Sequence, residues 1–191
     1  MTTLLSIQDG WFCAARRVES PHANARPKVI EQTNTDANIS LLVIHNISLP
    51  PNQFGSDDVE RLFLGQLDPK KHPFFNTIKH LQVSAHLFIR RNGELVQFVS
   101  MQDRAWHAGI SSFQGQAGCN DYAIGIELEG TDELPFTECQ YQQLGSVTQS
   151  IQSHYPCISL GRIVGHNDIA PGRKTDPGPC FDWSKYRLLL K

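Results

Sequence analysis

The chain has 191 residues, enough for one domain with a sizeable core and too few for two ordinary ones. Hydrophobic residues make up 40%, charged residues 19%, and the net charge is −2, which argues against a broad nucleic-acid or anionic-membrane surface. The five cysteines are an odd number without CxxC spacing, so we expect free thiols in a reducing compartment.

The N-terminal segment, residues 1–39, is polar and rich in turn-forming residues, so we expect a largely irregular arm. The start has no basic n-region and does not resemble a signal peptide. No run approaches the roughly 20 apolar residues of a membrane-spanning helix. We therefore expect a cytoplasmic protein with one domain over 1–191, whose core is 40–191.

Hydrophobic periodicity and turn signals predict the elements of this core. In chain order these are a buried strand at 40–46, a helix from 56 or 57 through 67, a hairpin with strands at 83–90 and 94–99, a short extended piece at 103–107, a polar loop at 109–121, a strand at 122–129, a helix at 137–155, a strand at 162–164 and a helix at 183–190. Strands and helices mix without strict alternation. This predicts an α/β or α+β fold with a mixed central sheet flanked by helices.

Two histidines and one carboxylate form a candidate metal site. His45 ends a buried strand, His166 follows another, and Asp176 lies in the tail at 165–179, which is too rich in Gly and Pro for regular structure. Neutral imidazoles and a carboxylate suit zinc, and three protein ligands leave a fourth position open for water. Spacing alone leaves a pair of structural histidines equally open, and His107 is a less favoured alternative for the third ligand.

Glu127 and Lys174 are the candidate catalytic residues. Glu127 could serve as the base for a zinc-bound water, and the Lys174 ammonium could stabilise an oxyanion. A rival interpretation pairs Glu127 with Glu129, roughly 7 Å away on the same strand face, as in an inverting glycosidase. That reading leaves the histidines unexplained, and we expect Glu129 to be a surface charge on a half-exposed strand.

Four separated segments carry a family resemblance: 42–48 (Leu-Val-Ile-His-Asn-Ile-Ser), 105–109 (Ala-Trp-His-Ala-Gly), 125–130 (Gly-Ile-Glu-Leu-Glu-Gly) and the tail at 165–179. Taken in order, they resemble the zinc-dependent N-acetylmuramoyl-L-alanine amidases, most of all the cytosolic members that recycle cell wall. The match extends from about residue 14 to 186, which is nearly the whole chain.

The resemblance implies a Zn²⁺ cofactor and a set of site residues: the ligands His45, His166 and Asp176, the catalytic residues Glu127 and Lys174, and the substrate-binding residues Asn46, Trp106 and Arg173. It implies hydrolysis of the amide between the lactyl group of 1,6-anhydro-N-acetylmuramic acid and L-alanine of the stem peptide. The partner would be this anhydro-muropeptide, with an influence on β-lactamase induction. We expect no nucleic-acid, membrane or obligate protein partner.

Two positions depart from the family pattern, which has an arginine where this chain has Gln82 and another in place of Gly118. A bidentate arginine contact to a carboxylate has no equal in glutamine or glycine, so the departures bear on affinity for the stem peptide.

Two alternatives to this function remain. One is a protein of the same fold that binds muropeptide without cutting it, and the other is a periplasmic amidase that acts on intact wall.

Overall fold

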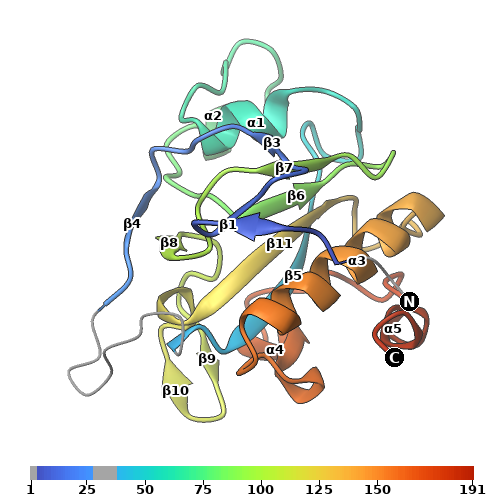
Figure 1. Ribbon diagram of the computed structural model, residues 1–191. Helices are drawn as coiled ribbons and strands as arrows, with labels where there is room; N and C mark the ends of the chain where they lie inside the picture. The colour runs from blue at the N-terminus through green and yellow to red at the C-terminus, as the bar shows by residue number, and fades with distance from the viewer. Residues whose placement is uncertain (1–3, 28–37) are drawn as a thin grey trace.

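The computed structural model describes residues 4–27 and 38–191, and a six-stranded sheet lies at its centre (Figure 1). Its strands, in spatial order, are β12 (Ile163–Gly165), β5 (Leu41–Ile47), β11 (Ala123–Glu129), β6 (Leu87–Ile89), β7 (Leu95–Gln97) and β3 (Arg16–Arg17). The first four run parallel, β7 is antiparallel to β6, and β3 is parallel to β7. The predicted mixed sheet is therefore confirmed.

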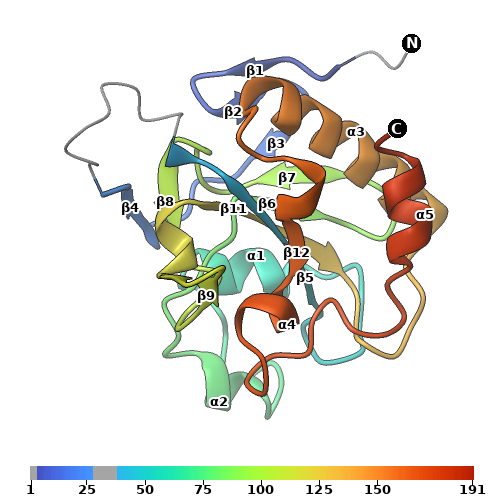
Figure 2. The same ribbon diagram turned by 90° about the horizontal axis from the view of Figure 1, so that it is seen from below.

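Helices cover both faces of this sheet (Figure 2). One face carries α3 (Glu138–His154) and α5 (Trp183–Leu188), and the other carries α1 (Asp58–Phe63), α2 (Phe75–Ile78) and α4 (His166–Ile169). Because a parallel sheet buries both of its faces, its central strands must be apolar on both sides.

Local sequence signals explain where two of these helices begin or end. At the start of α3, the Thr137 side chain accepts from the Gln140 N–H and the Gln140 side chain accepts from the Thr137 N–H, which forms a capping box where the predicted helix begins. The first helix is shorter than predicted and ends at Phe63, because Gly65 turns the chain into the left-handed region at φ 68°. The four-residue helix α2 was not predicted.

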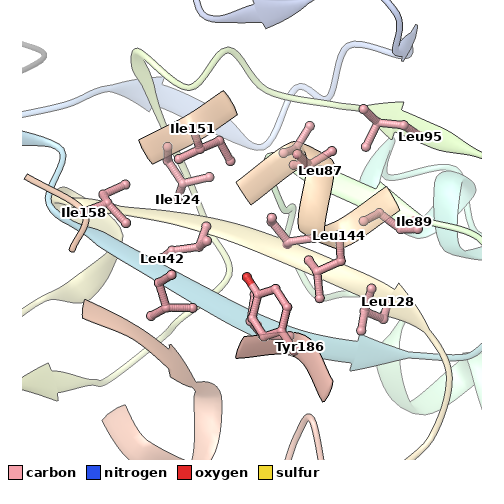
Figure 3. Packing of buried hydrophobic residues seen from close by; sticks show 14 of the residues in the cluster. Leu42, Leu87, Ile89, Leu95, Ile124, Leu128, Leu144, Ile151, Ile158 and Tyr186 are labelled. Atoms are coloured by element: carbon pink, nitrogen blue, oxygen red, sulfur yellow. The ribbon is translucent and has the colours of Figure 1, made fainter. Parts of the chain in front are cut away.

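The two central strands, β5 and β11, pack their alternate residues into separate clusters. Leu42 and Ile124 meet the apolar side of α3 (Figure 3), and Ile44 belongs to the same cluster. Leu41 and Val43 pack toward α4 on the opposite face. All seven residues of β11 are buried, so the expected half-exposed strand is wrong. Its neighbours β5 and β6 and the layers on both faces remove it from solvent.

The remaining elements are short and lie around the sheet. They are β1 (Ile7–Gln8), β2 (Trp11–Phe12), β4 (Ala23–Ala25), β8 (Asp103–Ala105), β9 (Ser112–Phe113), β10 (Gln116–Ala117), and the 3₁₀ turns η2 (Cys119–Asp121) and η3 (Leu160–Arg162). The four strands before residue 26 belong to the segment expected to be largely irregular, of which 1–3 and 28–37 lie outside the described residues.

Among the described helices, none combines the length and apolarity needed to cross a membrane. All five cysteines are free thiols, as expected.

Candidate metal centre and active site

His45 and His166 meet at the carboxyl ends of two adjacent parallel strands. His45 lies near the end of β5, and His166 opens α4 directly after β12, whose Gly165 pairs with Ile44. The Nδ1 atoms of the two histidines are 3.0 Å apart. Asp176 Oδ2 lies 2.9 Å from Nδ1 of His45 and 3.0 Å from Nδ1 of His166. The fold therefore brings the three predicted ligands to one point.

The tail loop is fixed where it presents Asp176. The Asp176 carbonyl accepts from the Asn167 N–H at 3.0 Å. The following Pro177 is buried, and the peptide bond between Asp176 and Pro177 is cis. The tail is not irregular throughout, because residues 166–169 form α4. This correction matters, since the helix turns the chain back so that His166 and Asp176 face each other.

The electrostatics of His45 and Asp176 favour binding of a divalent metal ion. Burial lowers the pKa of His45 to about 4, so its imidazole is neutral at pH 7. Burial also raises the pKa of Asp176, but hydrogen bonds with His166 and His45 outweigh it and hold the pKa well below its usual value. Two imidazoles and one carboxylate, all three ligand atoms within 4.8 Å of one another, fit zinc.

Glu127 lies beside this cluster on the same face of the sheet. It is buried, and its Oε2 atom has no hydrogen-bond partner among the described residues. Burial raises the pKa of Glu127 well above its usual value, the Asp176 carboxylate raises it further, and Lys174 opposes both. Lys174 itself is exposed. A buried carboxyl with a raised pKa next to a metal-ligand set is a candidate general base.

A cleft of about 770 Å³ opens above the cluster. The residues that line it include Glu127, His166, Lys174 and Asp176, whereas His45 is 1% exposed and is not part of the lining. One wall is largely apolar and comes from the region around α1 and α2, with Leu49, Leu62, Phe63, Phe74, Ile78, Leu81 and Val83. A cleft with one apolar wall and a cluster of titratable groups can bind an amphipathic ligand over the reacting centre.

The three predicted substrate-binding residues also line this cleft. The Asn46 amide donates to Asp132 Oδ1 at 2.7 Å and to the Pro177 carbonyl at 3.0 Å, so its orientation is fixed. The half-buried Trp106 donates from Nε1 to Asn24 at 2.6 Å. Sequence reasoning did not identify Asp132 or Asn24 because neither belongs to a recognisable motif.

The Arg173 side chain hydrogen-bonds to the backbone of the protein. Its Nη2 donates to the carbonyls of Ala108 at 2.6 Å and Ile110 at 2.7 Å, so it fastens the start of the loop at 109–121 to the tail. Arg173 is exposed and remains on the rim of the cleft. A role beside the stem peptide therefore stays a prediction.

Glu129 contradicts the expectation of a surface charge. It is 3% exposed, and its two carboxylate oxygens accept from the Gly55 N–H at 2.5 Å and the Arg91 N–H at 2.9 Å. It lines a separate hollow rather than the cleft that contains Glu127. The glycosidase interpretation needs two carboxyl groups facing one substrate, so this arrangement removes it.

His107 lies against the cluster but is not one of the three residues whose ligand atoms converge. Its Nδ1 atom is 3.0 Å from Nε2 of His45, which is the nitrogen on the far side of the ring from the other ligands.

Two positions depart from the family pattern. Gln82 is exposed between the cleft residues Leu81 and Val83, and Gly118 adopts a left-handed φ of 72°. Neither Gln82 nor Gly118 lines the cleft.

Comparisons with known proteins agree with this geometry. A family model described as N-acetylmuramoyl-L-alanine amidase matches residues 35–179. The 1,6-anhydro-N-acetylmuramyl-L-alanine amidase AmpD of Citrobacter freundii is 54% identical over 184 residues, 96% of this chain and 94% of that protein. A crystal structure of a Se-Met AmpD derivative superposes with a TM-score of 0.91 at 53% identity, over 98% of this chain and 100% of that one.

A further solved structure contains a substrate. It is the N-acetylmuramyl-L-alanine amidase AmiD from Escherichia coli in complex with anhydro-N-acetylmuramic acid-L-Ala-D-gamma-Glu-L-Lys. It matches with a TM-score of 0.59 and 30% identity, over 86% of this chain and 61% of that one.

Proposed function

This chain belongs to the N-acetylmuramoyl-L-alanine amidase family, and from that premise we propose that it is a zinc amidase of peptidoglycan recycling that uses the His45, His166 and Asp176 centre. The substrate would be an anhydro-muropeptide. The bond cut would be the amide between the lactyl group of 1,6-anhydro-N-acetylmuramic acid and L-alanine of the stem peptide. The observation that carries the proposal is the convergence of three ligand atoms, at 2.9–3.0 Å, next to a buried carboxyl in one cleft.

The ligand set and its neighbours divide the chemistry between them. A zinc ion held there would supply Lewis acidity, which polarises the scissile carbonyl and activates a water. Glu127 would take a proton from the attacking water and deliver it to the leaving amine of L-alanine. The Lys174 ammonium, on the rim of the same cleft, would stabilise the negative charge that develops on the carbonyl oxygen.

The cleft walls fit the two halves of such a substrate. Asn46, whose amide hydrogens are both used by Asp132 and Pro177, would meet the sugar and lactyl group together with the Trp106 ring. Arg173 would lie near the stem peptide. The protein would act in the cytoplasm and lower the pool of anhydro-muropeptides, and through that pool it would influence β-lactamase induction.

Mass-spectrometric product analysis tests this proposal. Purified protein incubated with an anhydro-muramyl-tripeptide should release the free tripeptide and anhydro-N-acetylmuramic acid. Intact sacculi, offered in parallel, should be a poor substrate if the protein acts in recycling. An unchanged muropeptide would contradict the amidase assignment and favour a protein that only binds it.

A further inference from the structure

One dipeptide, His107–Ala108, contacts the outer ring nitrogen of both histidine ligands. The Nε2 atom of His45 is 3.0 Å from Nδ1 of His107. The Nε2 atom of His166 is 3.1 Å from the carbonyl oxygen of Ala108. Both ligands therefore present Nδ1 to the metal centre and Nε2 to this dipeptide, His45 to the His107 side chain and His166 to the Ala108 backbone.

This dipeptide is held from two further directions. The buried Asn120 side chain, in η2, accepts from the backbone N–H of His107 at 3.1 Å and of Ala108 at 2.8 Å. On the other side, Gly125 of β11 leaves room for the imidazole: a Cβ at this position would lie 2.5 Å from the His107 ring. The His107 ring therefore packs directly on the Gly125 backbone, in the space that the side chain of any other residue at position 125 would occupy.

Binding of a metal ion determines which nitrogen carries the proton. Without the ion, Nδ1 of either histidine can donate to the Asp176 carboxylate. A neutral His166 that binds an ion through Nδ1 keeps a lone pair there and donates from Nε2 to the Ala108 carbonyl, which only accepts. His45 can offer a lone pair on Nδ1 only when its proton is on Nε2, and His107 Nδ1 must then accept it. The proton of His107 is then left on Nε2, a buried atom with no hydrogen-bond partner in the described part of the chain.

We propose that His107 is a positioning residue of the metal centre, which accepts the His45 Nε2–H and so fixes the tautomer and ring orientation with which His45 binds the ion. The inference rests on the proposed zinc centre. A histidine kept only for packing would have no reason to leave a buried ring nitrogen unpaired, because an unsatisfied buried polar atom is destabilising. Outer partners of this kind are known to orient histidine ligands in metal sites.

Zinc affinities of two matched variants test the inference. His107→Asn keeps an acceptor near the position of Nδ1, whereas His107→Leu has a similar volume and no acceptor. Competition with a chromogenic chelator should show His107→Leu binding zinc about 10–100-fold more weakly than the wild type. His107→Asn should bind close to the wild-type value. Equal affinities in all three proteins, or the same loss in both variants, would overturn the inference.

The wild-type protein gives a second, independent readout that does not depend on how the variants fold. Nitrogen NMR of the ¹⁵N-histidine-labelled, zinc-loaded protein should show His45 and His107 both protonated on Nε2. A proton on Nδ1 of either residue would overturn the inference. A wild-type protein that binds no zinc would overturn the proposed function as well, whereas zinc binding with the wrong tautomer would overturn this inference alone.

Discussion

Glu127 and His45 are paired residues of the parallel strands β11 and β5, so that the carboxyl and the imidazole lie side by side on one face of the sheet. The pairing gives the protein a rigid frame for its chemistry, because neither residue depends on a loop for its place. His166 comes to this frame from the start of α4, directly after β12, and Asp176 and Lys174 come from the tail loop that follows α4. Sites built on strands in this way hold their groups more firmly than sites built on loops.

Removing the carboxylate ligand should remove the metal. Asp176→Ala is expected to lose zinc and activity together, because it leaves only two imidazoles at the centre. Metal analysis of the purified variant measures the zinc content. Asp182→Ala is the matched control, because Asp182 caps α5 at a distance from the metal ligands in the sequence. Loss of this cap should lower the stability by about 1 kcal/mol while zinc is retained. Full zinc content in Asp176→Ala would exclude Asp176 as a ligand.

Glu127→Gln should separate metal binding from turnover. The amide has the shape of the carboxyl but cannot accept a proton, so kcat should fall by roughly 10²–10⁴-fold while zinc content is unchanged. Kinetics and metal analysis of the same preparation provide both readings. A rate near that of the wild type would take Glu127 out of the mechanism.

The same substitution should stabilise the metal-free protein in a pH-dependent manner. Because the folded-state pKa of Glu127 is raised, its contribution to stability is full below the unfolded value near 4.5 and is lost as the pH rises through the folded value. Glu127→Gln cannot ionise and should escape this loss. The difference in Tm between variant and wild type, both without metal, should therefore grow from pH 5 to pH 9. A constant difference would mean that folding does not raise the pKa of Glu127.

Lys174 should matter for the rate more than for zinc. Lys174→Met keeps the aliphatic stem and removes the ammonium, so kcat is expected to fall by about 10²–10³-fold, as for the loss of one oxyanion donor. Lys70→Met, at an exposed lysine that does not line the cleft, serves as the control. Equal rates in the two variants would place Lys174 among ordinary surface residues.

An arginine at position 82 should strengthen binding of the stem peptide. Gln82 is exposed between two cleft residues, so the longer side chain of Gln82→Arg can reach the rim and meet a peptide carboxylate in bidentate fashion. KM should fall with little change in kcat. Gln82→Lys has the charge without the planar fork and should give a smaller gain. An unchanged KM in both variants would show that another residue already anchors the peptide.

The central strands and the long helix could be predicted because their signals are local. The apolar run of β5 and the capping box at Thr137 specify their elements without help from distant residues. The short strands before residue 26 and the four-residue α2 carry no comparable signal. Strand β3 forms by pairing with β7, β4 by pairing with β8, and α2 packs Phe75 into a cluster with residues of β6 and β7.

The candidate site was predictable only in part, for a similar reason. A family motif can indicate His45, His166 and Asp176, but only the fold shows that Glu129 turns to the backbone of Gly55 and Arg91. Alternation along a strand predicts which face a residue takes, but it does not reveal whether that face is covered. The contact between His107 and His45 likewise joins residues 62 positions apart, so it cannot be predicted from their spacing in the sequence.

The most direct test of the account follows the released tripeptide through removal and return of the metal. The wild-type protein should cut anhydro-muramyl-tripeptide at the lactyl–alanine amide, lose this activity when a chelator strips the metal, and regain it when zinc alone is restored. Asp176→Ala should not be restored by zinc. Cleavage that continues after the metal has been stripped would contradict a zinc centre at His45, His166 and Asp176.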